Sequence, residues 1–305
     1  MDILVFGSIG MDLTTYVPTL PRLGETLRGS AYITVPGGKG NNQAVAAARL
    51  GAQTQFIGRV GDDQFGNDVI DTAAKENVDV SRVIKDSNHK TGLAVISVDE
   101  KADNAIIIIS GANMAMGADD VELAGPSMDG VKVVMLQLEI PVLVSVAAAK
   151  TAREKGAVVI FDPAPASELP ESSFRYMDVI TPNEVETEAL VGFYPETQAD
   201  AKRAAKMLRE KGVDTAIIKM GALGAFYDSA QGSGFVPAFK VNTIDTVAAG
   251  DAFNGGLAVA LAEGRAIPDA VRWGAAAGAI ATTRKGALPA MPYRSELMAL
   301  LEVNE

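Results

Sequence analysis

The stretch Val131–Asp162, VKVVMLQLEIPVLVSVAAAKTAREKGAVVIFD, contains the unit from which the fold is predicted. Its first and last apolar runs, Val131–Leu136 and Ala157–Phe161, are typical of short buried strands. Between them Val142–Lys155 has the length and composition of a helix, and Gly156 follows at the position where helices commonly end. A strand, a helix and a second strand in this order predict a parallel pair joined by a crossover helix.

The same alternation extends along most of the chain. Further strands are predicted at Ile3–Phe6, Thr54–Gly58, Val179–Thr181 and Thr215–Lys219. Further helices are predicted at Asn42–Leu50, Phe65–Glu76, Asp200–Lys211, Ala248–Glu263 and Pro268–Thr283. The pattern predicts an α/β fold with a parallel sheet covered by helices on both faces, and ligands beyond the carboxyl ends of its strands. No internal repeat or low-complexity linker interrupts it, so we expect residues 1–305 to form one continuous domain.

Two segments, Leu13–Pro36 and Lys90–Ser110, depart from this alternation. The first carries Pro and Gly residues and then an alternating run, and the second holds two apolar runs separated by polar residues, which predicts a hairpin. Together they predict a small antiparallel sheet that projects from the main body as a flap. The apolar run Ala105–Ile109 is long for an exposed sheet, so we expect one face to pack against substrate or a second subunit.

Composition and charge exclude several classes of function. The chain has 27 Lys and Arg against 38 Asp and Glu, a formal charge of −11, which disfavours binding to nucleic acid and to anionic membranes. It has no Cys and one His, His89, which we expect to lie at the surface without a role. Disulfides and thiolate chemistry are therefore excluded, and acid–base chemistry falls to carboxylates, Lys or Tyr.

The chain shows neither a targeting segment nor a common nucleotide-binding motif. Its start lacks the basic segment and long apolar run of a signal peptide, and no stretch approaches the roughly 18 apolar residues of a membrane span, so we expect a cytoplasmic protein. No G-x-x-x-x-G-K-[ST] occurs, and Gly7–Asp12, GSIGMD, does not match G-x-G-x-x-G. The sequence therefore gives no support for a function as a nicotinamide-dependent oxidoreductase.

The first positive signal is Gly37–Ala44, GGKGNNQA. Three glycines around Lys39 let the backbone approach a ligand closely, and the following helix presents amide groups and Asn42 to it. The alternative interpretation is an ordinary glycine-rich turn into a helix.

The second signal is Asp245–Gly256, DTVAAGDAFNGG. Its small residues leave the amides of Ala248 to Asp251 unobstructed at a helix amino terminus, which favours an anion. Asp251 in the first turn can act as a base for a hydroxyl beside that anion. The alternative for this Asp is plain capping or complementarity to the helix dipole.

Two further signals follow predicted strands. Asn183 and Glu186 lie three apart on a starting helix, so they face the same way and can hold a hydrated Mg²⁺, or they form a capping pair on a solvated acidic helix. Lys219–Gly224, KMGALG, is a glycine turn that fits a nucleotide-facing loop.

Taken together in this order, GGKGxNQA, TPNExE and DTxAAGDxFNG resemble the signatures of the ribokinase family of sugar kinases. Further matches extend the resemblance over essentially the whole chain, at Pro21–Thr26, Gly111–Asn113, Gln137–Pro141, Asp162–Ala166 and Thr283–Ala287. The resemblance implies a Rossmann-like three-layer body with a mostly parallel central sheet and a β-sheet lid, formed by about residues 13–36 and 90–110. It also implies ATP-dependent transfer to a primary sugar hydroxyl, and a homodimer formed through the lids.

The resemblance implies a role for each matching residue. The implied phosphoryl-transfer residues are Ala248, Ala249, Gly250 and Asp251, the last as the base for the sugar hydroxyl. The implied sugar-binding residues are Gly10, Asp12, Gly38, Lys39, Asn42, Glu139 and Asp251. The implied ATP-binding residues are Asn183, Lys219, Gly221, Gly224, Gly250 and Ala275. The implied metal sites are Glu186, which would order the waters of Mg²⁺, and a K⁺ site at Asp245, Val247, Ala281, Arg284 and Gly286.

Three residues depart from the family pattern. Gly10 stands where these kinases usually have Asn, so an amide that contacts the sugar is lost and we expect open space and weaker rejection of a sugar lacking a hydroxyl there. Ala290 replaces a Ser that ligates the cation, which weakens the expected K⁺ dependence. Lys219 replaces a Thr and adds a positive charge near the phosphates.

The hypothesis is therefore a kinase that makes D-ribose 5-phosphate and ADP from ribose and MgATP. One alternative is a kinase of the same family for 2-deoxyribose, another sugar or a nucleoside. The other is a sugar- or nucleotide-binding protein that performs no chemistry.

Overall fold

The main sheet of the computed structural model lies at the centre of the molecule. The structure describes residues 1–101 and 103–304, and within these residues the sheet has nine strands in the order β15-β14-β13-β12-β11-β10-β1-β4-β6. Their bounds are β1 (Ile3–Phe6), β4 (Thr54–Ile57), β6 (Val78–Asp79), β10 (Val133–Leu136), β11 (Val158–Phe161), β12 (Val179–Ile180), β13 (Thr215–Lys219), β14 (Gly224–Ser229) and β15 (Gly232–Pro237). Neighbours from β6 to β13 pair in parallel, and β14 and β15 pair antiparallel. The predicted, mostly parallel sheet is confirmed.

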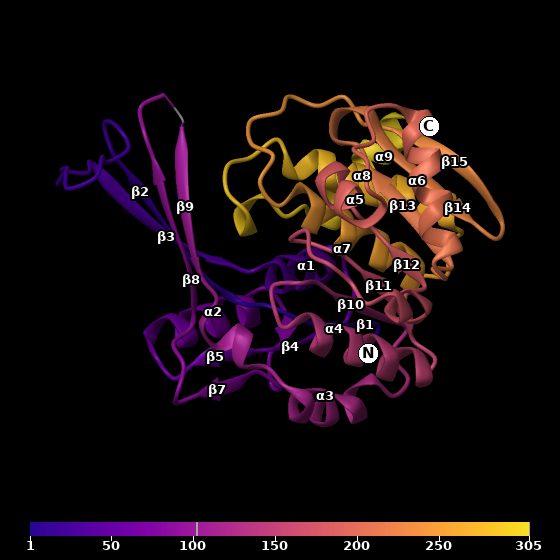
Figure 1. The fold of residues 1–305 in the computed structure, drawn as a ribbon, viewed down its shortest axis with the longest axis horizontal. Helices are drawn as coiled ribbons and strands as arrows, with labels where there is room; N and C mark the ends of the chain where they lie inside the picture. The colour runs from indigo at the N-terminus through magenta and orange to yellow at the C-terminus, as the bar shows by residue number, and fades with distance from the viewer. Residues whose placement is uncertain (102, 305) are drawn as a thin grey trace.

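Helices cover both faces of this sheet, as Figure 1 shows. Side chains alternate between faces along a strand, so Ile3 and Val5 of β1 pack into one core and Leu4 and Phe6 into the other. The first core is covered by α1 (Lys39–Arg49), α2 (Gln64–Lys75), α7 (Ala249–Ala262), α8 (Ile267–Ala281) and α9 (Arg294–Val303). The second is covered by α3 (Ala118–Ala124), α4 (Val142–Glu154), α5 (Glu184–Val191) and α6 (Gln198–Glu210).

A second sheet projects from one side of the body (Figure 1). Its strands, in spatial order, are β3 (Ala31–Gly37), β2 (Gly10–Tyr16), β8 (Gly92–Val98) and β9 (Asn104–Ile109). The outer pairs are antiparallel, but β2 and β8 at the centre are parallel. The predicted flap is therefore present, but the prediction of an antiparallel sheet is wrong at its centre. Both hairpins leave the body through their first strand, and this makes the central pair run the same way.

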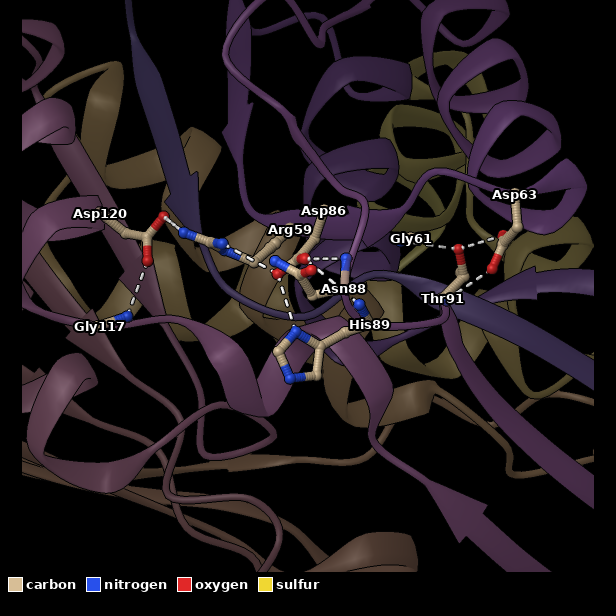
Figure 2. Close-up of polar contacts among 9 residues, drawn as sticks. All are labelled: Arg59, Gly61, Asp63, Asp86, Asn88, His89, Thr91, Gly117 and Asp120. Atoms are coloured by element: carbon tan, nitrogen blue, oxygen red, sulfur yellow. Dashed lines mark hydrogen bonds and ion pairs between the residues drawn. The ribbon is translucent and has the colours of Figure 1, made fainter.

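The base of this second sheet is attached to the body by buried polar contacts, drawn in Figure 2. Thr91 precedes β8, and its hydroxyl donates to Asp63 Oδ1 at 2.7 Å and accepts from the Gly61 amide at 3.0 Å. In the same region Arg59 of the short strand β5 (Arg59–Gly61), which pairs with β7 (Ile84–Asp86), forms ion pairs with Asp86 and Asp120. The side chain of His89 is 52% exposed and contacts Asp86 through Nδ1, which agrees with the predicted surface position.

Most predicted elements are confirmed with ends shifted by one to three residues. Helix α1 starts at Lys39, three residues before the predicted start, because Gly38 with a φ of 90° is its N-cap. Sequence reasoning missed the β14–β15 hairpin, α3 and α9, whereas α5 begins where the helix start at Asn183 was predicted. Strands β14 and β15 contain four Gly and Pro residues in twelve, and this composition is typical of loops.

Across residues 1–101 and 103–304, no helix has the length and apolar character needed to cross a membrane.

Candidate active site

Polar side chains gather where neighbouring parallel strands of the main sheet end. Glu139 follows β10, Asp162 follows β11, Glu186 follows β12, and Lys219 is the last residue of β13. Because parallel strands end at the same edge of a sheet, these groups from distant parts of the chain are brought to one place. The expectation of a site at the carboxyl edge of the sheet is supported by this arrangement.

Asp251 lies in the first turn of α7 and is only 4% exposed. Its Oδ2 accepts a hydrogen bond from Asn42 Nδ2 at 3.1 Å, and its Oδ1 accepts one from Gln43 Nε2 at 3.1 Å. Both amides belong to α1, which packs against α7. The glycine–lysine turn and the late helix, separated by about two hundred residues in sequence, therefore meet at this carboxylate.

The backbone before Asp251 is strained. Ala248 is the N-cap of α7 and has a φ of 59°, a left-handed conformation that costs an alanine free energy. No side chain caps the helix. The Ala249 amide donates to the Thr246 carbonyl at 3.3 Å, so the prediction that every amide from Ala248 to Asp251 is free is wrong at Ala249, because a turn uses it.

The charges around Asp251 are mixed. Burial raises the pKa of Asp251 to about 6, with the positive charge of Lys39 acting in the opposite direction and Asp162 adding to the rise. Burial alone would lower the pKa of Lys39, but the carboxylates of Asp251, Asp162, Glu139 and Glu186 outweigh it, and the net pKa is raised. Lys39 therefore stays protonated in the site, and Asp251 is ionised at neutral pH.

A second group of contacts lies on the side of the flap. Glu139 Oε2 accepts from the Ser8 hydroxyl at 2.6 Å and from the Lys39 amide at 2.9 Å. Asp12 lies on β2, and burial followed by the charge of Glu139 raises its pKa to about 6. A Cβ on Gly37 would lie 2.5 Å from Asp12 Oδ1, so a side chain at position 37 would force this carboxylate to move.

Gly10 does not leave the space that its missing side chain predicts. A Cβ at this position would lie 2.6 Å from the Gly92 carbonyl oxygen, because the parallel pairing of β2 and β8 brings Gly10 opposite Gly92. The expectation of open space is therefore wrong on this backbone. Gly10 still has no polar side chain with which to contact a sugar.

Asn183 and Glu186 form a capping box at the start of α5. The Glu186 amide donates to Asn183 Oδ1 at 2.9 Å, and the Asn183 amide donates to Glu186 Oε2 at 2.8 Å. The capping alternative is thus confirmed in its geometry, but Glu186 is 6% exposed and does not lie on a solvated face. Burial raises its pKa, Lys219 acts against the rise, and Asp162 adds to it.

The turn from β13 to β14 brings the predicted nucleotide-facing residues to the same edge. Lys219 Nζ donates to Asp162 Oδ1 at 3.0 Å. Gly221 and Gly224 both have positive φ, and a Cβ on Gly224 would lie 2.1 Å from the Val236 carbonyl oxygen, so only glycine fits there. Ala275 is partly exposed on α8, which packs on α7.

The sequence matches known carbohydrate kinases over its length. The family model described as pfkB family carbohydrate kinase matches residues 1–294. A ribokinase of Haemophilus influenzae is 39% identical over 298 residues, which are 98% of this chain and 97% of the relative. The chain belongs to the pfkB family of carbohydrate kinases. It is a phosphotransferase that acts on a sugar hydroxyl, and the resemblance stated from the motifs is confirmed.

Two further relatives of this kinase are informative. A deoxyribokinase of Salmonella typhi is 35% identical over 306 residues, which are 100% of both chains. The structure of Arabidopsis thaliana ribokinase complexed with ribose and ATP matches with a TM-score of 0.92 and 31% identity, and covers 99% of this chain and 98% of the other. The ribokinase-like fold, with its large sheet and small second sheet, is confirmed by this neighbour.

Of the residues predicted to hold a monovalent cation in this kinase, Val247 and Gly286 contact Asp245. Its Oδ1 accepts from the Val247 amide at 3.0 Å and its Oδ2 accepts from the Gly286 amide at 2.9 Å. The Thr282 carbonyl, next to Ala281, accepts from the amides of residues 244 and 245. Arg284 is turned to an ion pair with Glu296, so only its backbone is left for the predicted role.

Three functional candidates were missed by sequence reasoning. Gln43 stands inside the quoted glycine–lysine motif, but only the structure shows its contact with Asp251. Asp162 was noted as part of a family match and given no chemistry, although an acid directly after a predicted strand is a signal. Ser8 gave no signal beyond its place after the first strand.

Proposed function

We propose that this carbohydrate kinase transfers the γ-phosphoryl group of ATP to the 5-hydroxyl of D-ribose, giving D-ribose 5-phosphate and ADP. The observation that carries the proposal is the buried carboxylate of Asp251 at the amino end of α7, held by Asn42 and Gln43. The ribokinase relatives and the neighbour complexed with ribose and ATP supply the substrate. We take residues 1–305 as a single kinase domain whose lid is formed by about residues 13–36 and 90–110.

In this proposal Asp251 accepts the proton of the sugar hydroxyl as that oxygen attacks the γ-phosphorus. The bond from this phosphorus to the bridging oxygen of ADP breaks, and ADP leaves with its electron pair. The amides of Ala248, Gly250 and Asp251 face the charge that develops on the phosphoryl oxygens. Phosphoryl transfer depends mainly on positioning and electrostatics, so amides fixed before the reaction are an effective contribution.

The sugar is proposed to bind between the lid and the body. Carboxylates and amides suit this role because each accepts or donates paired hydrogen bonds with neighbouring hydroxyls. The proposed sugar-binding residues are Asp12, Gly38, Lys39, Asn42, Glu139 and Asp251. Contacts already present hold Glu139 against the Lys39 amide, so the carboxylate is oriented before the sugar arrives.

ATP is proposed to bind along the carboxyl edge of the main sheet. The proposed contacts are Asn183, Lys219, Gly221, Gly224, Gly250 and Ala275. Glu186 fits a hydrated Mg²⁺, because the one hydrogen bond of its carboxylate within the described residues uses Oε2 and leaves Oε1 for bound water. Bound Mg²⁺ would neutralise charge on the phosphates.

A K⁺ ion is proposed to bind through backbone carbonyls near Asp245. The residues that would hold it are Asp245, Val247, Ala281, Arg284 and Gly286. They fit this role because Asp245 holds the segment before α7 against the segment after α8. The bound ion would add positive charge near the strained turn that begins α7.

We also propose a homodimer formed through the lids. The four consecutive residues Ile106, Ile107, Ile108 and Ile109 of β9 are 54, 64, 70 and 49% exposed, and a second lid would bury such an edge strand. A kinase that consumes ATP needs a compartment that contains ATP, so we propose the cytoplasm as its location.

A second candidate substrate is 2-deoxyribose. Gly10 lacks the amide that ribokinases usually offer the sugar, and a deoxyribokinase is among the relatives at full coverage. A site without that polar group loses less when a hydroxyl is absent from the sugar.

The test is a panel of ribose, 2-deoxyribose, other pentoses, hexoses and nucleosides in a coupled ADP assay with MgATP, run with KCl and again with NaCl. We expect the highest kcat/KM for ribose and faster turnover with KCl. A preference for 2-deoxyribose would replace ribose by the second candidate. Binding of sugar and nucleotide without ADP formation from any member of the panel would indicate a non-catalytic binding protein and overturn the proposal.

A further inference from the structure

Asp162 and Gln43 are two buried residues between the proposed nucleotide site and Asp251. Gln43 is fully buried, and its Nε2 donates to Asp162 Oδ2 at 2.9 Å and to Asp251 Oδ1 at 3.1 Å. Its Oε1 accepts from Gln137 Nε2 at 2.7 Å. Because ionised carboxylates only accept, the amide nitrogen of Gln43 must face both acids. Asp162 is therefore one hydrogen-bonded residue away from the base.

Asp162 also holds Lys219. Its Oδ1 accepts from Lys219 Nζ at 3.0 Å, and the side chains are 3% and 12% exposed. The backbone amide of Asp162 donates to the Leu136 carbonyl at 2.9 Å, which fixes the acid to the end of the main sheet. One carboxylate thus uses each of its oxygens for a different partner, the lysine and the amide that contacts the base.

The ammonium group of Lys219 lies between the Asp162 carboxylate and the amino end of α7. A Cβ on Gly250 would lie 3.4 Å from Lys219 Nζ, so the ammonium group lies at the amino end of α7. That end carries the positive partial charge of the helix dipole. An ammonium group has three N–H donors, and in the described residues one of them is used, on Asp162. The other two remain for a phosphoryl oxygen.

We propose that Asp162 is a positioning residue that sets Lys219 for the phosphoryl group and, through Gln43, sets Asp251 for the sugar hydroxyl. The inference rests on the proposed function, because it gives Lys219 and Asp251, the two ends of this linkage, roles in the same phosphoryl transfer. Lys219 contacts the nucleotide phosphates directly, and Asp162 contacts neither substrate.

The linkage predicts that Asp162→Asn and Lys219→Met move the acidic limb of the kcat/KM profile against pH in opposite directions. Asp251 is faced by Lys39, Asn42 and Gln43 from α1 and by Asp162 from the end of β11. Asp162→Asn removes a negative charge near the base, so the acidic limb of the kcat/KM profile moves to lower pH. Lys219→Met leaves Asp162 without its cation, so the limb moves to higher pH. We expect shifts of about 1 pH unit in each direction.

The double variant Asp162→Asn/Lys219→Met is the matched control. It removes both charges, so we expect its acidic limb to return to within a few tenths of a pH unit of the wild type. A merely structural role would lower activity and thermal stability in the single variants but would leave the position of the limb unchanged. An unmoved limb in both folded single variants would overturn the proposal. If Asp162→Asn does not fold, the position of the limb in Lys219→Met alone still tests the linkage, and an unmoved limb there would overturn it.

A binding measurement separates this inference from the proposed function. Isothermal titration with a non-hydrolysable ATP analogue and with AMP needs no turnover. We expect Lys219→Met to bind the analogue about tenfold more weakly and AMP as the wild type does, since only the analogue carries a γ-phosphoryl group. Equal affinities for the analogue in wild type and variant would overturn the role of Lys219. A wild type that binds ATP but phosphorylates no sugar would instead overturn the proposed function.

Discussion

Among single residues, Asp251 combines two properties that usually oppose each other. It is buried, which raises its pKa to about 6, and yet it must be ionised to accept a proton near neutral pH. Lys39 and the amides of Asn42 and Gln43 stabilise the ionised form, as their hydrogen bonds and charge act against burial. A pKa near but below the working pH is the range in which a carboxylate is an effective general base.

Substituting Asp251→Asn tests the base directly. We expect kcat to fall by about 10²- to 10⁴-fold, because a general base typically contributes a factor of this size. Nucleotide affinity, measured by titration calorimetry, should stay within a few-fold. The matched control is Asp269→Asn, since Asp269 also lies in the first turn of a helix but is exposed. An Asp251→Asn enzyme as active as the Asp269→Asn control would contradict the assignment.

The raised pKa of Asp251 also predicts a pH dependence. Protonated Asp251 cannot accept the hydroxyl proton, so kcat/KM should fall as pH decreases below about 6 and should be constant above it until another group titrates. Asp12 has a pKa of about 6 for a similar reason, so its protonation steepens the same limb. We expect a decline of one to two orders of magnitude per pH unit, checked by initial rates in buffers of constant ionic strength. A profile that is flat between about pH 5 and pH 7 would exclude Asp251 as the base.

The second sheet is attached to the body by a few contacts between elements at its base. Thr91 connects the segment that leads into β8 with Asp63, the N-cap of α2, and with the Gly61 amide. The bond between Thr91 and the Gly61 amide is buried and that to Asp63 is partly buried, beside the strand pair β5–β7 (Figure 2). In the proposed function this sheet is the lid that admits and encloses the sugar, and a stiff base would let its strands move as a unit.

Replacing Thr91→Val tests this attachment. Valine keeps the shape but removes the hydroxyl, so the Gly61 amide loses a buried acceptor and Asp63 loses a donor. We expect a loss of about 1–3 kcal/mol in the free energy of unfolding, a Tm lower by several degrees, and faster amide hydrogen exchange in β8. The control is Thr72→Val, whose hydroxyl donates to the Asp68 carbonyl on an exposed helix surface. Equal Tm values for the two variants would show that the contact does not stabilise the base.

For the whole molecule, the projecting sheet leaves an apolar edge strand uncovered in the single chain. All four isoleucines of β9 from residue 106 to residue 109 are exposed on both faces. Exposed apolar edge strands are prone to pairing with another chain, and proteins usually cover or charge them. A second lid packed against this strand, as in the proposed dimer, would cover the exposed isoleucines.

The dimer is tested with paired variants of this strand. Side chains alternate along a strand, so Ile106 and Ile108 share one face and Ile107 and Ile109 the other. Analytical ultracentrifugation should give the wild type a mass of about twice 31.7 kDa. Changing both residues of the face covered in the dimer to Thr, which keeps strand propensity, should produce monomers, and changing the other face should have a smaller effect. A wild type that is monomeric at micromolar concentration would contradict the proposed dimer.

The sequence alone predicted the central sheet, most of its helices and the candidates Lys39, Asn42 and Asp251. It could do so because buried parallel strands are continuous apolar runs, and because glycine-rich turns before helices are local patterns. The folded chain was needed to show the features that depend on contacts between distant segments: the parallel pairing of β2 with β8, the Gly92 backbone that fills the space at Gly10, and the linkage from Lys219 through Asp162 and Gln43 to Asp251. Such contacts follow from the packing of α1 on α7 and from the order of strands in the sheet, and no local stretch of sequence encodes either.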